Sequence, residues 1–276
     1  MAGFRLGAVA RSAGYRLTAY DEIGSTNGEA LAAAKSGDPG GHWFVTDRQL
    51  AGRGRRGRPW EGPRGNLAAT LLLVPDAEPE LNATLGFVAG LALYEALARV
   101  LPQVRSEPGA DGRHLYGGNS RIALKWPNDV LADGQKLAGI LLEATSRPGG
   151  RPAIAIGIGV NVAVAPEGLP YPAESVRSLG GDADAAEMFE ALGDAWVSAF
   201  SLWRDGEGVE EVLARWRAAA TGLGGPVAVQ QDGAVIRGIF ESIDGAGRLI
   251  IRADDDSRIA ISAGDVHFGA TASARS

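Results

Sequence analysis

The dipeptide Asp133-Gly134, which stands between two apolar runs, constrains the fold of this chain more than any other local feature. Asp-Gly favours the type I′ turn of a two-residue hairpin, because both residues tolerate a positive φ angle. Such a turn would pair Leu131 with Lys136 and Asp129 with Ala138. Since side chains alternate along a strand, Asp129, Leu131 and Lys136 are expected on one face, with Asp129 and Lys136 as diagonal neighbours about 7 Å apart. Both charged groups could then contact one ligand, although a lysine that only protects an edge strand would give the same pattern.

The run of residues 153–162 is almost wholly apolar but contains two glycines. Glycine weakens the interior of a strand, so Gly157 and Gly159 predict that a ligand or another backbone comes close. Asn161 is a polar residue in the same run and must find a hydrogen-bond partner when it is buried. A strand with these properties is expected to form one wall of a binding site.

The remaining pattern predicts mixed α and β structure. Further strands are expected at residues 16–20, 42–46 and 67–74. Helices are expected at about 25–35, 83–100, 183–203 and 208–220. The first helix should begin with a capping box from Thr26 to Glu29 and stop at Gly37.

Two further segments differ from the rest in composition or in strand pattern. Residues 102–120 are rich in Gly, Pro and Ser and predict a long exposed loop. After residue 226 the chain reads as short alternating strands, with turns expected at 231–233, 244–245 and 254–256. This C-terminal pattern predicts a small β-barrel.

The composition is that of a soluble globular chain of one or two domains, since 45% of its 276 residues are hydrophobic and its formal net charge is −6. A general nucleic-acid binder usually carries a broad basic face, so none is expected here. The absence of cysteine excludes disulfides, thiolate metal sites and thiol nucleophiles, and it favours a reducing cytoplasm. The longest apolar segment, residues 85–101, includes Glu95 and Arg99 and therefore predicts a buried helix rather than a membrane span.

Positive charge is concentrated in residues 52–58, the glycine-arginine loop, which reads GRGRRGR. Its glycines match the G-x-G-x-x-G spacing of dinucleotide sites, but Pro59 and Pro63 prevent the helix that such a site requires. A solvated basic turn remains one interpretation. Repeated glycines favour another, in which a mobile loop closes around a small anion and becomes ordered by it. Alternate residues of an extended loop point apart, so at least one of Arg56 and Arg58 is expected to face solvent.

Taken together, these stretches resemble the biotin protein ligases. The motifs that carry the resemblance are, in chain order, Ser25-Thr26-Asn27, Gln49–Arg58 with Trp60, Pro63–Leu67, Lys125–Asp129, Lys136–Ile140 and Gly157–Asn161. The resemblance implies an α+β fold like that of class II aminoacyl-tRNA synthetases, a mixed sheet with helices. It further implies a catalytic domain at residues 1–222 and an SH3-like barrel at 223–276.

The same resemblance implies a two-step reaction. Biotin and ATP, with Mg²⁺, would give biotinyl-5′-AMP and pyrophosphate, and the biotinyl group would pass to a lysine of the biotin carboxyl carrier domain of acetyl-CoA carboxylase or a related carboxylase. Mg²⁺ is expected through the ATP phosphates, and no protein metal site is assigned. Joining a carboxylate to a phosphate requires fixed cations, which arginine and lysine can supply.

The residue roles follow from the resemblance and the hairpin geometry. The catalytic residues would be Arg53, Arg55, Lys136 and Asp129, the last as the group that takes a proton from the incoming lysine. Biotin would be bound by Ser25, Thr26, Asn27, Gln49, Gly52, Arg53, Arg55, Lys136, Gly139 and Gly157. The nucleotide would be bound by Arg55, Arg58, Trp60, Asn128 and Asn161. Helix capping would equally explain Ser25 and Thr26, and Asn128 could be an ordinary turn residue.

Two alternatives from different classes remain. Lipoate ligases and octanoyltransferases share the fold, but the R-R-x-S-G-G-G segment that is typical of them is absent from this sequence. A nucleic-acid-binding module would rest on the arginines alone. Because only 24 residues precede Ser25, the DNA-binding domain that some biotin ligases carry is not expected, and neither nucleic acid nor membrane is an expected partner. A monomer and a homodimer are both compatible with the sequence.

Overall fold

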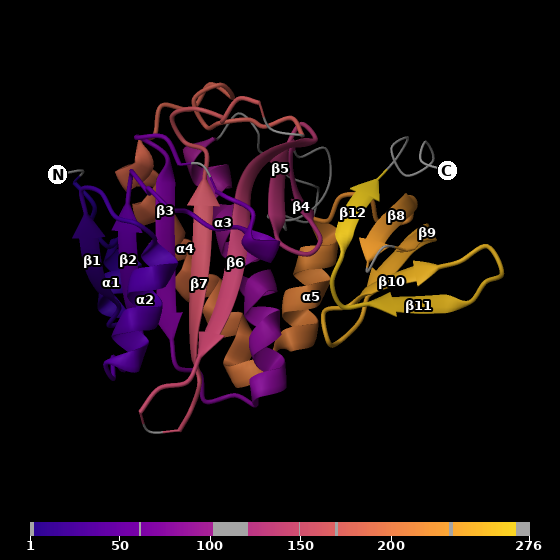
Figure 1. The fold of residues 1–276 in the computed structure, drawn as a ribbon, viewed down its shortest axis with the longest axis horizontal. Coiled ribbons are helices and arrows are strands. Elements are labelled where there is room, and N and C mark those ends of the chain that lie inside the picture. Colours follow the sequence, from indigo (N-terminus) through magenta and orange to yellow (C-terminus); the bar gives the residue numbers. More distant parts are fainter. Residues whose placement is uncertain are drawn as a thin grey trace, which may run out of the picture.

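The computed structural model describes residues 3–60, 62–101, 121–148, 150–168, 171–231 and 234–268. Within these residues the chain forms a seven-stranded mixed sheet with helices and a separate five-stranded antiparallel sheet (Figure 1). The predicted α+β class with a small C-terminal β domain is therefore confirmed. The loop predicted at residues 102–120 lies outside the described residues, as does part of the turn predicted at 231–233.

The large sheet brings the predicted site strands to its centre and one side. Its order is β1 (Arg16–Tyr20), β2 (His42–Thr46), β3 (Leu67–Leu73), β7 (Ala153–Val160), β6 (Gln135–Thr145), β5 (Asp129–Ala132) and β4 (Ile122–Lys125). Only β1 and β2 run parallel, and the other pairs are antiparallel. The strand bounds predicted from sequence agree with β1 and β2 and exceed β3 by one residue.

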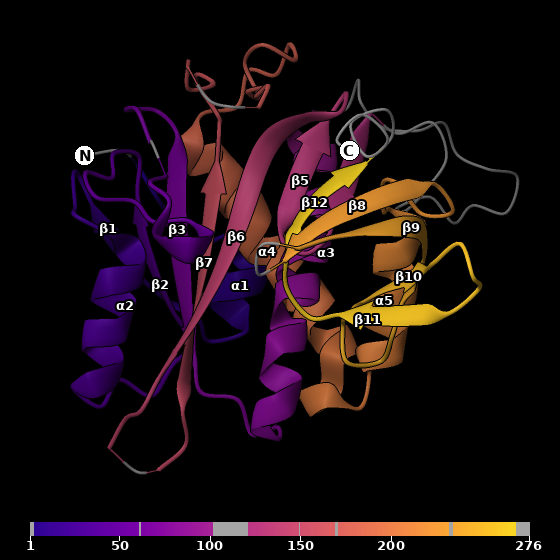
Figure 2. The same ribbon diagram turned by 45° about the vertical axis from the view of Figure 1, so that its right-hand side comes forward.

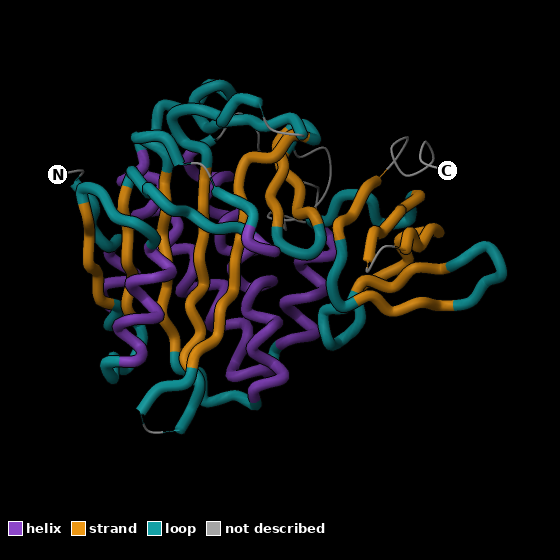
Figure 3. Tube along the Cα trace, viewed as in Figure 1, coloured by secondary structure: helices purple, strands orange, loops and turns teal. Residues whose placement is uncertain are grey.

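Helices cover both faces of this sheet (Figure 3). They are α1 (Ala8–Ser12), α2 (Thr26–Lys35), α3 (Leu85–Val100), α4 (Ala185–Trp203) and α5 (Val209–Ala218), with short 3₁₀ turns at Arg55–Gly57, Pro79–Thr84 and Arg204–Gly206. Strand β2 shows how the layers separate: Trp43 and Val45 point into the large core with α3 and α4, whereas Phe44 points into a small alanine-lined core under α2. The alternation of side chains along a fully buried strand therefore supplies both cores.

Among the described residues, one helical stretch, Pro79–Val100, is long and apolar enough to cross a membrane. Its apolar window is 78% buried inside the fold, where α3 packs against α4, α5 and the sheet. The position agrees with the buried helix predicted from Glu95 and Arg99, whose charges interrupt the segment.

The start of helix α2 differs from the prediction by one residue. Ser25, not Thr26, is the N-cap, and its side-chain oxygen accepts a hydrogen bond from the backbone of Gly28 at 3.3 Å. Ser25 adopts an extended backbone, as an N-cap must, and Thr26 is already helical. The predicted capping box from Thr26 to Glu29 is therefore wrong, whereas the predicted stop is confirmed by Gly37, which has a φ of 92°.

The hairpin between β5 and β6 has the predicted turn but not the predicted register. Asp133 and Gly134 have φ angles of 50° and 79°, as a type I′ turn requires. Leu131 pairs with Lys136 as expected, but Asp129 pairs with Gly139 rather than Ala138, because the register shifts by one residue between Val130 and Leu131. A β-bulge in β6 thus accommodates an extra residue, which a two-residue turn alone does not predict.

The C-terminal sheet packs beside helix α5 and the end of the large sheet (Figure 2). Its strands, in spatial order, are β11 (Arg258–Ile261), β10 (Leu249–Arg252), β9 (Ala234–Ile243), β8 (Pro226–Gln231) and β12 (Asp265–Phe268). The indole of Trp126 donates a hydrogen bond to the carbonyl of Gly247 at 2.9 Å, and Arg217 donates to that of Ile243. These two hydrogen bonds join the C-terminal domain to the large sheet and to helix α5.

Candidate active site

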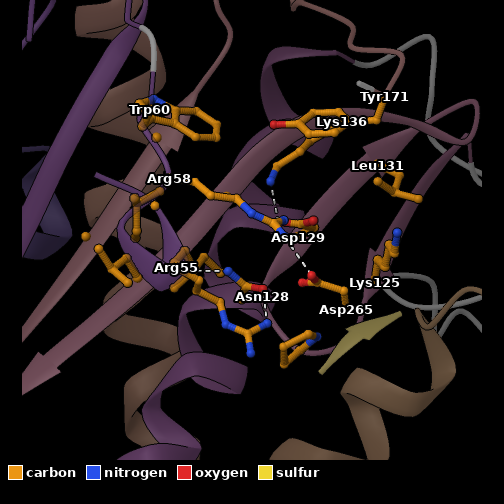
Figure 4. A pocket seen from close by; sticks show the side chains of 18 of the residues that line it. Arg55, Arg58, Trp60, Lys125, Asn128, Asp129, Leu131, Lys136, Tyr171 and Asp265 are labelled. Carbon is orange, nitrogen blue, oxygen red and sulfur yellow. Dashed lines mark hydrogen bonds and ion pairs between the residues drawn. The ribbon is translucent and has the colours of Figure 1, made fainter. Parts of the chain in front are cut away.

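A cavity of about 820 Å³ lies between the glycine-arginine loop, the start of α2, the strands β5 to β7 and the barrel strand β12 (Figure 4). Of the residues predicted to form a site, thirteen line this cavity: Ser25, Thr26, Asn27, Gln49, Arg53, Arg55, Arg58, Trp60, Asn128, Asp129, Lys136, Gly139 and Gly157. Motifs that are far apart in the sequence therefore meet in one place.

Gly52 and Asn161 lie behind the cavity wall. A Cβ at Gly52 would stand 2.4 Å from the carbonyl oxygen of Trp60 and 2.5 Å from Gln49 Nε2, so glycine lets the loop fold tightly on itself. Asn161 is 2% exposed, and its amide donates to the backbone carbonyl of Glu174 at 3.0 Å. The predicted hydrogen-bond partner is thus found, yet Asn161 Oδ1 has none among the described residues.

One end of the cavity is lined by small polar side chains. The Oε1 atom of Gln49 accepts from both the backbone N–H and the hydroxyl of Thr26, at 2.9 and 3.1 Å. Because Ser25 Oγ already accepts the Gly28 N–H, its own hydroxyl hydrogen remains available to a ligand. This end can therefore offer both donors and acceptors.

The glycine of β7 nearest this end is explained by Asn27. A Cβ at Gly157 would lie 2.3 Å from Asn27 Oδ1, so a side chain approaches the strand, not the backbone that the sequence suggested as one possibility. Asn27 is buried and donates to Glu143 Oε2 at 2.7 Å, and its Oδ1 accepts from Thr70 at 2.6 Å. Sequence reasoning missed Glu143, although strand parity places it on the same face as the predicted Gly139.

Lys136 occupies the centre of the cavity. Its Nζ lies 2.8 Å from Asp129 Oδ1, and the ring centroids of Trp60 and Tyr171 are 5.5 and 5.3 Å away (Figure 4). The backbone N–H of Lys136 donates to the carbonyl of Pro172 at 3.0 Å. The predicted placement of Asp129 and Lys136 on one face is confirmed, and Tyr171 is an aromatic neighbour that the sequence did not indicate.

Trp60 lies flat against two glycines. A Cβ would stand 3.1 Å from its ring at Gly139 and 2.4 Å from its ring at Gly159. Because neither glycine has a side chain, the indole can pack directly against the backbone of strands β6 and β7. The approach predicted at Gly159 is therefore made by an aromatic side chain.

The change Gly159→Ala is expected to displace this indole, because a methyl group cannot fit at 2.4 Å from it. Overpacking of this kind typically costs about 1–3 kcal/mol, so we expect the free energy of unfolding to fall by about that amount. Urea denaturation followed by tryptophan fluorescence would measure it. Gly24→Ala, where nothing lies within 4 Å of an added Cβ, is the matched control.

The arginines of the loop have different partners. Arg55 donates to Asn128 Oδ1 at 3.2 Å, and Arg53 lies 3.5 Å from Glu143. Burial lowers the pKa of the Arg55 guanidinium, and the neighbouring charge of Arg56 lowers it further. In the part of the chain that the structure describes, the side chain of Arg55 is hydrogen-bonded to an amide rather than paired with a carboxylate, which favours an anionic ligand.

Arg56 and Arg58 both pair with Asp265 of the barrel, at 2.9 and 2.7 Å. Their side chains are 44% and 63% exposed, and Arg56 does not line the cavity, so the expectation that at least one of the two faces solvent is confirmed. Burial alone would raise the pKa of Asp265, but the hydrogen bond and charge of Arg58 hold it below its ordinary value. Asp265 is a second residue that sequence reasoning missed.

The change Asp265→Asn is expected to loosen the glycine-arginine loop. Two partly exposed pairs contribute about 1 kcal/mol together, so tryptic cleavage at the loop should become about three- to fivefold faster. Limited proteolysis with mass mapping of the fragments would show it. Asp244→Asn, which removes a barrel carboxylate that pairs with Arg248, should leave the loop unchanged.

A second lysine, Lys125, faces the same cavity near the barrel (Figure 4). Burial is the main cause that lowers the pKa of its ammonium group. Its Nζ lies 6.0 Å from the ring centroid of Phe268. The cavity thus contains cations along its length.

The sequence is similar to two protein families and to several curated proteins. Residues 29–162 match the Biotin/lipoate A/B protein ligase family, and residues 222–269 match the Biotin protein ligase C terminal domain. The biotin--[acetyl-CoA-carboxylase] ligase of Paracoccus denitrificans is 41% identical over 250 residues, which cover 89% of this chain and 97% of that protein. Its counterpart in Mycobacterium tuberculosis is 33% identical, with 94% and 91% covered.

Solved structures agree. The biotin protein ligase of Aquifex aeolicus in complex with biotin and ATP superposes with a TM-score of 0.72 at 23% identity, over 92% of this chain and 99% of that one. The Leishmania major enzyme in complex with biotinyl-5-AMP gives 0.58 at 25% identity, over 90% and 98%. From the similarity of its sequence over nearly the full length of curated relatives, this chain belongs to the biotin protein ligase family.

Proposed function

We propose that this protein activates biotin with MgATP to biotinyl-5′-AMP and transfers the biotinyl group to a lysine of a biotin carboxyl carrier domain. The observation that carries the proposal is one cavity with a polar end at Ser25 and Thr26, a cation at Lys136 in the middle, and the indole of Trp60 as a wall. The relatives' names describe a ligase acting on acetyl-CoA carboxylase, which supports the same activity.

Recognition of biotin would use the polar end. A cyclic urea presents one carbonyl acceptor and two N–H donors. The free hydroxyl hydrogen of Ser25 and the NH₂ group of Gln49 suit the carbonyl, whereas Thr26 Oγ1 suits an N–H group. Arg53, on the loop beside this end, would then close over the bound ring.

In the first step a carboxylate oxygen of biotin would bond to the α-phosphorus of ATP, and the bond to the β-phosphate oxygen would break to release pyrophosphate. Both reactants are anionic, so the barrier falls when fixed cations hold them together. Lys136 and Arg55 are placed for this role, because both are partly buried and both line the cavity. Arginine can hold two phosphate oxygens with its planar fork.

Mg²⁺ would enter as part of the nucleotide substrate. Over the described ranges, no group of three or more His, Cys, Asp and Glu side chains could hold a metal ion. We therefore propose that phosphate oxygens and water ligate the Mg²⁺ ion, and that the protein holds the triphosphate. Lys125 is a cation for that purpose at the barrel side of the cavity.

The adenylate would lie against Trp60, with Asn128 and Arg58 beside it. Asn161 would act from behind the wall, where its amide donates to the backbone carbonyls of Lys136 and Glu174 at 3.4 and 3.0 Å and so holds Lys136 in place. The indole, seated on Gly139 and Gly159, would stack on the base.

In the second step the neutral amine of a carrier lysine would attack the acyl carbon, and AMP would leave. Asp129 is the carboxylate nearest to Lys136 and is proposed to take the proton from the amine. Closure of the glycine-arginine loop would shield the mixed anhydride from water until the carrier arrives.

We further propose a division into a catalytic unit, residues 1–222, and a barrel, 223–276, since the two sheets share no strand among the described residues. A cytoplasmic monomer or homodimer without nucleic-acid or membrane partners fits the net charge of −6 and the absence of cysteine. Arg56 and Arg58 both pair with Asp265, which offsets part of the positive charge of the loop.

The deciding experiment is mass spectrometry of a purified carrier domain after incubation with the protein, biotin and MgATP. We expect one added biotinyl group and biotin-dependent release of pyrophosphate. Lipoate and octanoate, offered in parallel, distinguish the related acyl ligases that share the matched family. Modification with lipoate but not biotin would replace the proposed activity by that of a lipoate ligase.

A further inference from the structure

Glu143 has no part in the steps described above, yet it contacts the polar end of the cavity from behind. Its Oε2 accepts from Asn27 Nδ2 at 2.7 Å, and its Oε1 lies 3.5 Å from a nitrogen of Arg53. A carboxylate only accepts hydrogen bonds, so the NH₂ end of the Asn27 amide must face it. Glu143 therefore fixes the orientation of this buried amide, with Nδ2 toward Glu143 and Oδ1 away from it.

The fixed amide sets the direction of the next hydrogen bonds. Asn27 turns its Oδ1 toward Thr70, whose hydroxyl donates to it at 2.6 Å. Thr70 has one hydroxyl hydrogen, so toward Thr26, whose oxygen is 2.8 Å away, it can then only accept. The hydroxyl hydrogen of Thr26 then has two acceptors inside the protein, Thr70 Oγ1 at 2.8 Å and Gln49 Oε1 at 3.1 Å, and it points toward one of them rather than into the cavity.

Thr26 therefore presents lone pairs, and no hydrogen, to the cavity that it lines. If the Asn27 amide were reversed, Thr70 would give its hydrogen to Thr26, and only Gln49 Oε1, which already accepts the backbone N–H of Thr26, could hold the Thr26 hydrogen. A hydroxyl hydrogen that points into the cavity would oppose an N–H group of the ligand.

We propose that Glu143 is a positioning residue which, through Asn27 and Thr70, makes Thr26 an acceptor for a ureido N–H of biotin. The inference rests on the proposed function, because it assumes that the ring binds at this end. It explains why a carboxylate is placed behind a wall of neutral polar side chains. It also explains why Gly157 leaves room for the Asn27 amide in one defined place.

A double-mutant cycle tests the relay. Glu143→Gln keeps the volume but can donate as well as accept, so it no longer fixes the amide, and biotin should bind about 10-fold more weakly. Thr26→Val removes the acceptor itself and should weaken binding about 10- to 100-fold. If the relay acts through Thr26, the double variant should bind no more weakly than Thr26→Val alone, as measured by calorimetry.

Other variants separate the possible outcomes. Thr70→Val cuts the relay without touching Glu143 and should show the same non-additivity with Thr26→Val. Affinity for MgATP should not change in Glu143→Gln, and Glu241→Gln, which alters a barrel carboxylate that pairs with Arg258, should leave biotin affinity unchanged. Additive losses in either cycle would overturn the inference. Failure of the unmodified protein to bind biotin would instead refute the proposed function.

Discussion

Replacing Lys136 by alanine is expected to slow formation of biotinyl-5′-AMP about 10²- to 10³-fold, the usual cost of removing one fixed charge from a reacting centre. Its side chain is only 19% exposed and lies 2.8 Å from Asp129, so water screens its charge poorly. Repulsion between the biotin carboxylate and the α-phosphate grows as the two approach, and the effect should therefore fall on kcat more than on KM. Single-turnover release of pyrophosphate would measure it.

The matched control is Lys35→Ala. Lys35 is exposed in the last turn of α2 and does not line the cavity, so its removal should leave the rate unchanged. A Lys136→Ala protein that folds normally and forms adenylate at the original rate would exclude Lys136 from the first step.

The second large effect is expected for Asp129→Asn, at the transfer step. The asparagine keeps the shape of the side chain but cannot take a proton from the carrier lysine, and loss of such a base costs about 10²- to 10⁴-fold. Adenylate formation should fall less, because Lys136 keeps its cation–π contacts with Trp60 and Tyr171. Adenylation and transfer from preformed biotinyl-5′-AMP should be measured separately.

Asp133→Asn supplies the control for that experiment. Asp133 lies in the adjacent turn with a φ of 50°, a conformation that asparagine adopts readily. Both half-reactions should proceed at the unmodified rate in this variant. Equal losses in the two half-reactions of Asp129→Asn would show that Asp129 only holds Lys136 in place.

Local rules were sufficient for much of the fold and the site. The Asp133-Gly134 turn, the stop at Gly37 and the close approaches at Gly157 and Gly159 depend on backbone conformation or missing side-chain volume, which the sequence states directly. The proximity of Lys136 to Asp129 could be predicted because the turn type and the alternation of side chains place both on one face.

The residues that were missed depend on contacts between distant segments. Asp265 matters because the barrel packs next to the loop, and Glu143 matters because Asn27 reaches across from another element. Neither carboxylate differs from an ordinary surface residue when only its neighbours in sequence are read. The bulge beside Leu131 was missed for a similar reason, since turn type fixes register only as far as the strands remain regular.

That irregularity has a practical consequence for anyone who transplants or redesigns this hairpin. A regular ladder of unchanged length would place Ala138, rather than Gly139, across from Asp129. The methyl group of Ala138 would then stand where the Trp60 ring and the Lys136 side chain now pack against Gly139. The bulge thus keeps a glycine at this position, and a redesigned hairpin should retain the extra residue as well as the glycine.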